Sequence, residues 1–375
     1  MNHRDLALAA MRGEPVDHVP FIARMDLWYG YQQQHGLLPA QYGKASLWDF
    51  QRDIGVGIFG HGVDCPPFYR VEYRGAEITR DTTDGYTITR FATPHGTLTC
   101  RDRMTAELQG AATTEARTEF AFKGPEDYDA LQYLLDHARI VEDLDTCGRY
   151  VASIGTDGLA VPSVRRLPAQ ELMLTWMGYE RFYLELHDNP AKVDALLASL
   201  TEQLHQTLDL AVKCDAIALQ FGGNYDEMMT PPPIFERFFA PHYRDIRARL
   251  TPAGKILVTH GDGEMRRLLQ QLMDCGVQVV EALTPKPMTS IDIAQTRALW
   301  GDRVTMWGGV ATVILTDVFS DAEFETFLHA LFRAVAPGDH FILGFGDNVP
   351  TDAPYERVRR VVDFWAAHGR YPLAG

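Results

Sequence analysis

The feature that most constrains the fold of this chain is a series of eight short apolar runs, rich in β-branched residues, with amphipathic stretches between them. This alternation is typical of parallel strands joined by crossover helices. The eight runs are 19–24, 55–59, 150–154, 216–221, 256–260, 277–281, 304–307 and 341–345. Eight parallel strands close a barrel, so the sequence predicts an α/β fold of the (β/α)8 TIM barrel type.

The alternation is interrupted between the second and third runs. Residues 66–120 have the pattern of antiparallel β-hairpins, with Asp84-Gly85 and His95-Gly96 as turn signals. We expect an insertion beside the barrel mouth, as a lid or as part of a homodimer contact. Helical periodicity covers 190–212 and 231–250. Because the sequence has no internal repeat and no flexible linker, we predict one domain over residues 1–375.

The charge of the chain argues against some partners. Fifty acidic residues against 35 basic ones give a formal charge of −15, which repels nucleic acid and anionic membranes. The N-terminal residues resemble no signal or transit peptide, and no apolar run has the length of a membrane span, so we expect a cytoplasmic protein. The five cysteines are widely spaced without a CxxC pair, which argues against both a disulfide framework and a zinc knuckle.

Several segments together resemble the uroporphyrinogen decarboxylase superfamily over nearly the whole chain. They are RDLALAAMRGEPVDHVP, GYERFYLELHDNPAKVDALL, PPPIFERFFAPHYRDI, KILVTHGDGEMRRLL, GVQVVEALTP and GDNVPTDAPYERV. The superfamily includes the porphyrinogen decarboxylase, corrinoid-dependent methyltransferases and relatives of cobalamin-independent methionine synthase. The resemblance implies a TIM barrel with its site at the carboxyl ends of the strands.

The resemblance also implies a set of site positions. The superfamily's methyltransferases bind zinc through His-x-Cys after the fifth strand and Cys after the last, and the methionine synthase relatives add a Glu after the sixth. The matching residues here are His260, Asp262, Asp347 and Glu281, so aspartates replace both cysteines. The decarboxylase has an arginine-rich loop after its first strand. The matching stretch, ARMDLWYGY, keeps Arg24 but is a poor host for a substrate with many carboxylates.

One imidazole and three carboxylates form a plausible ligand set for a divalent cation. Oxygen-rich sets suit Mn²⁺ and tolerate Fe²⁺ or Zn²⁺, so we expect His260, Asp262, Glu281 and Asp347 to bind a metal whose identity is open. Without a metal, crowded carboxylates raise each other's pKa, and His260, Asp262 or Asp347 could act in acid–base catalysis. Bland alternatives remain: Asp262 and Asp347 as helix caps or turn formers, His260 as a buried hydrogen-bonded residue, and Glu281 as an arginine's ion-pair partner.

Five residues are candidates for substrate contact. Arg24 and Asp26 follow the first run, where the alternative is an ion pair at the barrel rim. Gln220 and Asn224 flank two glycines after the fourth run, where they could equally brace a loop. Trp307 precedes two glycines and could form a stacking wall, although a core position is commoner for tryptophan.

Two enzymatic functions remain open. The first is a metal-dependent methyltransferase acting on a small oxygen- or nitrogen-containing substrate, with a corrinoid protein or tetrahydrofolate as methyl carrier. The second is a cofactor-free decarboxylase or lyase acting on a small carboxylic acid or on uroporphyrinogen, in which Arg24 fixes a carboxylate and Asp347 supplies a proton. A non-enzymatic binding protein is a third reading, which the four ionisable groups disfavour. The usual dinucleotide, P-loop and metalloprotease motifs do not occur in the chain.

Overall fold

A computed structural model describes residues 1–61, 65–110 and 115–373. The chain forms two compact units. Unit 1 comprises Met1–Pro66, Asp145–Ser163 and Asp215–Gly375, and unit 2 comprises Pro67–Leu144 and Val164–Cys214. All the predicted site residues belong to unit 1.

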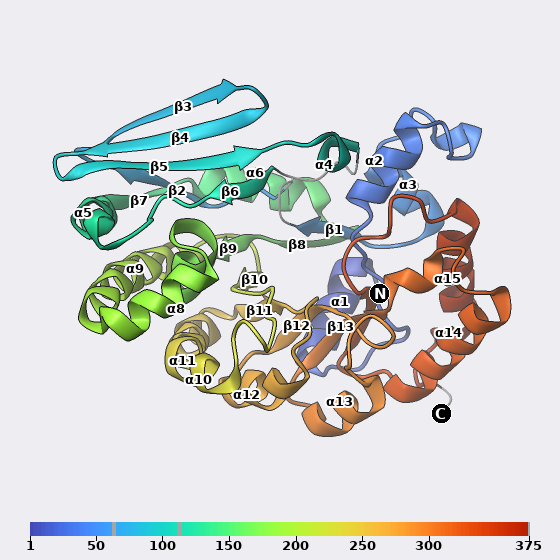
Figure 1. The fold of residues 1–375 in the computed structure, drawn as a ribbon. Coiled ribbons are helices and arrows are strands. Elements are labelled where there is room, and N and C mark those ends of the chain that lie inside the picture. The colour runs from blue at the N-terminus through green and yellow to red at the C-terminus, as the bar shows by residue number, and fades with distance from the viewer. Residues whose placement is uncertain (62–64, 111–114, 374–375) are drawn as a thin grey trace. The chain divides into compact units, whose positions relative to one another are not determined.

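Unit 1 is an α/β structure built on parallel strands (Figure 1). Its strands are β1 (Ile58–His61), β8 (Gly158–Val161), β10 (Ala218–Phe221), β11 (Ile256–His260), β12 (Val279–Leu283), β13 (Thr305–Val310) and β14 (Phe341–Phe345). β1 pairs with β8, and β10 to β14 pair with one another in sequence order. The predicted first run forms only single bridges, in which Phe21 pairs with Leu343 and Ile22 with Gly57. This arrangement of parallel strands is consistent with a TIM barrel.

An apolar core lies between the strands of unit 1 and helix α1 (His3–Arg12). Strand residues alternate in direction, so those two apart share one face. The members that come from strands or from the first run are Ile22, Leu159, Val161, Ala218, Ile256, Val258, Val279, Trp307 and Ile342. Six consecutive residues of α1, from Leu6 to Met11, and Val16 complete the cluster. This layer fixes which strand residues point inward at the carboxyl ends.

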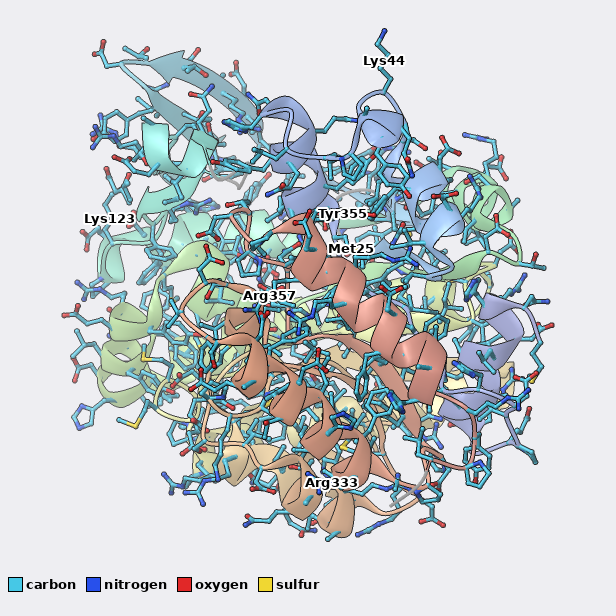
Figure 2. All side chains as sticks on the ribbon, turned by 90° about the vertical axis from the view of Figure 1, so that its right-hand side faces the viewer. Met25, Lys44, Lys123, Arg333, Tyr355 and Arg357 are labelled. Carbon is cyan, nitrogen blue, oxygen red and sulfur yellow. The ribbon has the colours of Figure 1, made fainter. Side chains whose placement is uncertain are left out.

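Helices follow or precede most strands of unit 1. The longer ones are α2 (Asp26–Gln34), α3 (Leu47–Ile54), α11 (Ala240–Leu250), α13 (Ile293–Trp300), α14 (Asp321–Val335) and α15 (Tyr355–His368). α14 begins with a capping box of Ser320 and Glu323, which satisfies free backbone N–H groups at its first turn. Arg357 on α15 donates to the Phe319 carbonyl at 2.9 Å and pairs with Asp321 at 2.8 Å, which ties α15 to the start of α14 (Figure 2).

The strand predicted at 150–154 is wrong. These residues are the last turns of α6 (Leu144–Ile154), and the strand is β8, a few residues further on. A short apolar run does not distinguish a strand from a buried helical turn. Here Cys147 and Ile154 are seven residues apart and both buried, which is the helical spacing of one face. Gly155 then ends the helix with φ 59°.

Unit 2 contains antiparallel sheets and helices. β2 (Tyr69–Tyr73) pairs with β7 (Ala138–Glu142), and β3 (Glu77–Thr83), β4 (Tyr86–Thr93), β5 (Gly96–Arg103) and β6 (Ala116–Glu119) form a four-stranded sheet in that order. The turn signal at Asp84-Gly85 joins β3 to β4, with φ 54° and 75°, as a two-residue hairpin requires. Helices α5 (Tyr128–Asp136), α8 (Tyr179–Asp188) and α9 (Pro190–Ala211) complete the unit. None of the helices described in either unit is both long and apolar enough to cross a membrane.

Candidate functional site

Alternation along β11 and β12 points two ionisable residues inward. Val258 and Val279 pair across these strands within the apolar core, and the next pair on the same face is His260 and Glu281. The register shifts after Val280, which marks a bulge in β12 around Glu281. Bulges of this kind turn side chains near functional sites. The two side chains therefore form a polar layer directly above the apolar one.

His260 lies between two carboxylates. Its Nδ1 is 2.6 Å from Oε2 of Glu281, and its Nε2 is 3.5 Å from Oδ2 of Asp262. The side chains of His260 and Glu281 are 6% and 5% exposed. Burial alone lowers the pKa of His260, but attraction to Glu281 and hydrogen bonds to both acids outweigh it and raise the pKa well above its usual value. The two carboxylates therefore favour the protonated form of His260.

The three carboxyl groups of the His260 cluster, which consists of His260, Asp262, Glu281 and Asp347, are not equivalent. Burial raises the pKa of Asp262 and Glu281, yet the charge of His260 and its hydrogen bonds prevail and lower both values. Burial raises the pKa of Asp347, the Asp262 carboxylate adds to it, and the net shift is upward. Of the three carboxyl groups, Asp347 is therefore the one that most readily carries a proton.

Arg24 and Asp26 form the predicted ion pair and also reach the cluster. Arg24 Nε donates to Oδ1 of Asp26 at 3.0 Å, and its Nη1 lies 3.5 Å from Oδ1 of Asp347. Asn348 is a further neighbour: with its amide turned to suit both partners, it donates to Asp26 at 3.1 Å and accepts from Arg24 at 3.0 Å. The sequence analysis did not select Asn348. Arg24 thus connects the loop after the first run to the loop after β14.

Of the two candidates after β10, Asn224 contacts the cluster. Asn224 has φ 52°, its Nδ2 donates to Asp262 at 3.3 Å, and its backbone N–H donates to the His260 carbonyl at 3.2 Å. A Cβ on Gly223 would come within 2.6 Å of the His260 Cβ, so only glycine fits there. Gln220 is buried, and its Oε1 has no hydrogen-bond partner among the described residues.

His61 is a site residue that the sequence analysis missed. It ends β1 two residues after Phe59, which packs on the apolar core, so alternation points both inward. Its ring lies 5.9 Å from that of His260 at an interplanar angle of 23°. Both ring nitrogens are buried and have no hydrogen-bond partner within the described residues. Burial lowers the pKa of His61, which favours the neutral imidazole. The available signal was its position two residues beyond the predicted strand at 55–59.

Two of the candidates need correction or refinement. Trp307 is a core residue: it is 1% exposed, its Nε1 donates to the Ile22 carbonyl at 2.8 Å, and its ring packs on Phe59. The stacking wall predicted for it is therefore not the arrangement in the structure. Asp262 contacts His260 and Asn224, and the next helical turn begins only at Arg266, so helix capping does not account for it.

Comparisons with known proteins place the fold. The sequence model of uroporphyrinogen decarboxylase (URO-D) matches residues 170–368, more than half of the chain. The chain belongs to the uroporphyrinogen decarboxylase family. Among solved structures, a methyltransferase from Methanosarcina mazei is similar over 98% of this chain and 99% of that chain, with 14% identity and a TM-score of 0.59. At that identity the likeness shows the fold alone. No curated protein matches the sequence.

The residues matched by the family model include only part of the candidate site of this URO-D family member. His260, Asp262, Glu281 and Asp347 lie inside the matched residues, whereas Arg24 and His61 precede them. Within the described residues, two groups of side chains have donor atoms within 4.8 Å of one another, close enough to share a cation. One is His260, Asp262 and Asp347, and the other is His61, His260 and Glu281. The predicted ligand set is therefore divided between two groups that share His260.

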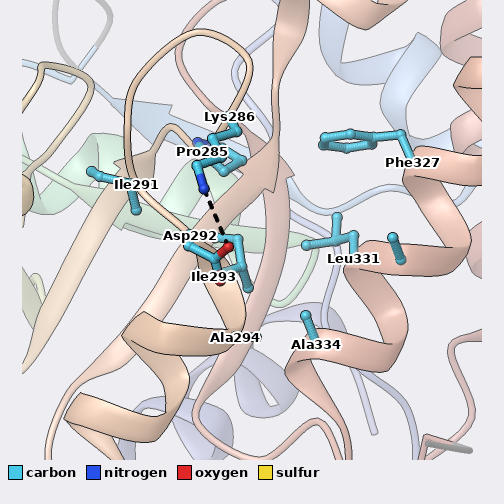
Figure 3. Close-up of a pocket in the computed structure, with 10 residues that line it drawn as sticks. Pro285, Lys286, Ile291, Asp292, Ile293, Ala294, Phe327, Leu331 and Ala334 are labelled. Carbon is cyan, nitrogen blue, oxygen red and sulfur yellow. Dashed lines mark hydrogen bonds and ion pairs between the residues drawn. The ribbon is translucent and has the colours of Figure 1, made fainter.

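A separate cavity lies on the outer side of the loop after β12. It has a volume of about 230 Å³ and is lined by Pro285, Lys286 and Ile291 of that loop and by Phe327 and Leu331 of α14. Figure 3 shows the ion pair of Lys286 with Asp292 at its edge, at 3.5 Å. Its walls are mostly apolar, and none of the His260 cluster is among its lining residues. It therefore offers no chemistry comparable to that of the cluster.

Proposed function

We propose that this protein is a metal-dependent, methyltransferase-like enzyme of the URO-D family. It would transfer a methyl group between a corrinoid or folate carrier and an oxygen or nitrogen atom of a small substrate. The observation that carries the proposal is His260 held between Glu281 and Asp262 with Asp347 close by. These are the positions at which the resembling methyltransferases bind their metal. The choice of methyl transfer is supported by the resemblance and by the name of the similar solved structure, whereas the choice of methyl carrier rests on the resemblance alone.

The donor set fits a divalent cation. The 3.5 Å separation of His260 Nε2 and Asp262 Oδ2 is close to the spacing of two ligands on one ion, given bonds of about 2.0–2.2 Å. The Glu281 carboxylate on Nδ1 can orient the ring and strengthen Nε2 as a ligand, as carboxylate partners of metal-bound histidines do. When bound, a cation supplies Lewis acidity that lowers the pKa of an O–H or N–H group. Because carboxylates replace both thiolates, we expect an oxygen or nitrogen acceptor rather than a thiol.

The residues of this chain have defined tasks in such a transfer. The lone pair of the substrate atom forms the new bond to the methyl carbon, and the old bond breaks with its electron pair left on the carrier. The proton released by the substrate would pass to a carboxylate of the cluster that does not hold the cation. Gln220 and Asn224 line the approach and orient the substrate, and Arg24 holds Asp347 in place.

A decarboxylase or lyase is the second candidate, and a specific observation favours it. The pKa of Asp347 is raised, whereas the pKa values of Asp262 and Glu281 are lowered. When environments push the pKa values of neighbouring carboxyl groups apart in this way, the group with the raised pKa can act as the acid and the others as bases. In this reading Arg24 binds the substrate carboxylate, the C–C bond breaks to release CO₂, and the electron pair left on carbon takes the proton of Asp347. The substrate would be a small carboxylic acid or, less favourably, uroporphyrinogen.

We also propose that the parallel strands of unit 1 close into a (β/α)8 barrel. The first run bridges β14 to β1, and the Gln220 N–H donates to the Pro162 carbonyl at 3.0 Å, next to the end of β8. These bonds connect the sheet of β1 and β8 to the larger sheet at β14 and at β10. In this architecture the antiparallel strands within 66–120 are an insertion between barrel strands, and the chain is one barrel domain.

Elemental analysis of protein purified without chelator tests the proposal. Wild type, His260→Ala and the control His187→Ala would be loaded in parallel with Mn²⁺, Fe²⁺ and Zn²⁺. The His187 side chain is 89% exposed, so the control removes an imidazole outside the site. We expect near-stoichiometric metal in wild type and in the control, and none in His260→Ala. Equilibrium dialysis with methylcobalamin and with 5-methyltetrahydrofolate then tests the carrier.

The outcomes separate the two functions. Metal that depends on His260, together with binding of either methyl carrier, supports methyl transfer. Absence of metal in wild type under all three conditions would overturn the metal-dependent function. The acid–base decarboxylase or lyase would then be the better reading, because it needs only the carboxyl groups and Arg24.

A further inference from the structure

His61 combines burial with two unused ring nitrogens. Buried side-chain nitrogens nearly always have a hydrogen-bond partner, and leaving one without a partner costs about 1–3 kcal/mol. Neither nitrogen of His61 has one in the part of the chain that the structure describes. The ring faces that of His260, and its donor atom lies within 4.8 Å of those of His260 and Glu281. A ligand bound at this point would satisfy a nitrogen that the described residues leave without a hydrogen bond.

The two candidate donor groups share His260, but their carboxylates lie at different nitrogens of its ring. Glu281 lies at Nδ1 and Asp262 at Nε2, on opposite sides of the ring. A neutral imidazole binds one cation through one nitrogen, so the two groups are alternatives. The group on the Nε2 side has one nitrogen and two carboxylates, and the group with His61 has two nitrogens and one carboxylate.

We propose that His61, His260 and Glu281 form a second, nitrogen-rich cation site that selects a transition-metal ion such as Zn²⁺ or Fe²⁺. Imidazole ligands suit these ions, and two histidines with one carboxylate are a common iron or zinc set, whereas Mn²⁺ and Mg²⁺ prefer carboxylates. The two imidazoles and the Glu281 carboxylate would hold this cation. The inference rests on the proposed metal-dependent function and adds to it the residue that decides which metal is used.

Metal titrations of matched variants test the proposal. Wild type, His61→Ala, His61→Gln and Asp347→Asn would be titrated with Zn²⁺ and with Mn²⁺ by calorimetry. Loss of His61 should weaken Zn²⁺ binding at least tenfold and change Mn²⁺ binding less than threefold. Asp347→Asn should do the reverse, because Asp347 belongs only to the oxygen-rich group. Circular dichroism of the metal-free proteins verifies folding, and the Gln variant is used if the Ala variant fails to fold.

A spectroscopic count of ligands adds a readout that a purely structural histidine would not affect. Electron spin-echo modulation of a bound Cu²⁺ ion counts coordinated imidazoles. We expect two in wild type and one in the His61 variants. One imidazole in wild type, with Zn²⁺ affinity unchanged on loss of His61, would overturn this inference and leave the proposed function intact. Failure of wild type to bind any metal would overturn both.

Discussion

The buried pair of His260 and Glu281 gives the most direct test of the electrostatics of the site. Replacing Glu281 with Gln keeps the shape and an acceptor oxygen but removes the charge 2.6 Å from Nδ1. Removing one partner of a buried ion pair costs about 3–5 kcal/mol. In the Gln variant His260 can lose its proton and still donate one neutral hydrogen bond. We therefore expect the free energy of unfolding to fall by the lower end of this range, about 3 kcal/mol at pH 6.

The pH dependence of this loss has a defined sign. The pKa of His260 in the folded wild type is raised well above 6.5, so the folded protein keeps a proton that the unfolded chain releases near that value. Wild-type stability is therefore complete below pH 6.5 and falls above it, by up to about 1.4 kcal/mol per pH unit, until the folded pKa is passed. The Gln variant lacks the Glu281 charge, which is the largest cause that raises the pKa of His260. The difference in the free energy of unfolding between wild type and the variant should therefore narrow as the pH rises above 6.5.

Urea unfolding in EDTA, followed by tryptophan fluorescence from pH 5.5 to 8.5, measures this difference. The signal reports mainly unit 1, because Trp176 is the one tryptophan of six in unit 2. Glu236→Gln is the matched control, since Glu236 pairs with Arg244 at 2.7 Å but both side chains are half exposed. Such exposed pairs contribute about 0–1 kcal/mol. If Glu281→Gln lowers the free energy of unfolding as little as the control does, and without pH dependence, His260 and Glu281 do not form a charged buried pair.

Two further substitutions test how the loop after β10 supports the site. Gly223→Ala should weaken metal binding at least tenfold, because the new methyl group would clash with the Cβ of His260. Gly254→Ala is the control: Gly254 also has a positive φ, but a methyl group there would meet open space, so metal binding should be unchanged. Asn224→Ala removes the donor to Asp262 and should weaken metal binding about tenfold to a hundredfold by calorimetric titration; unchanged affinity would make Asn224 a loop brace.

Local sequence patterns predicted the strand ends that carry the cluster. The runs at 256–260 and 341–345 coincide with β11 and β14, because continuous β-branched stretches bounded by polar and glycine residues are typical of buried parallel strands. His260, Asp262, Glu281 and Asp347 come together since the carboxyl ends of parallel strands meet at one edge of the sheet. The family resemblance, now confirmed, independently indicated the same positions.

Other features depended on tertiary contacts that a single sequence does not show. The run at 150–154 satisfies either a strand or the inner face of a helix, and the packing of Cys147 and Ile154 decided for the helix. The significance of His61 lies in its unsatisfied nitrogens, which depend on what surrounds the ring. Trp307 can be a core residue because its ring N–H donates a hydrogen bond to the Ile22 carbonyl. Each outcome is set by residues distant in sequence.

The exchange of two thiolates for aspartates links the two proposed functions. A thiolate favours a soft or borderline ion and serves poorly as a proton donor once metal-bound, whereas a carboxylate can bind a hard ion or carry a proton. Asp347 shows both capacities, because it shares a donor group with His260 and has a raised pKa in the cation-free site. If a cation binds, His260 would give up its proton and the cluster would supply Lewis acidity. Without one, the carboxylates would favour a protonated His260, and Asp347 would be the acid. Under these proposals metal occupancy would decide the chemistry of the same four residues, which is why metal content should be measured before any substrate is sought.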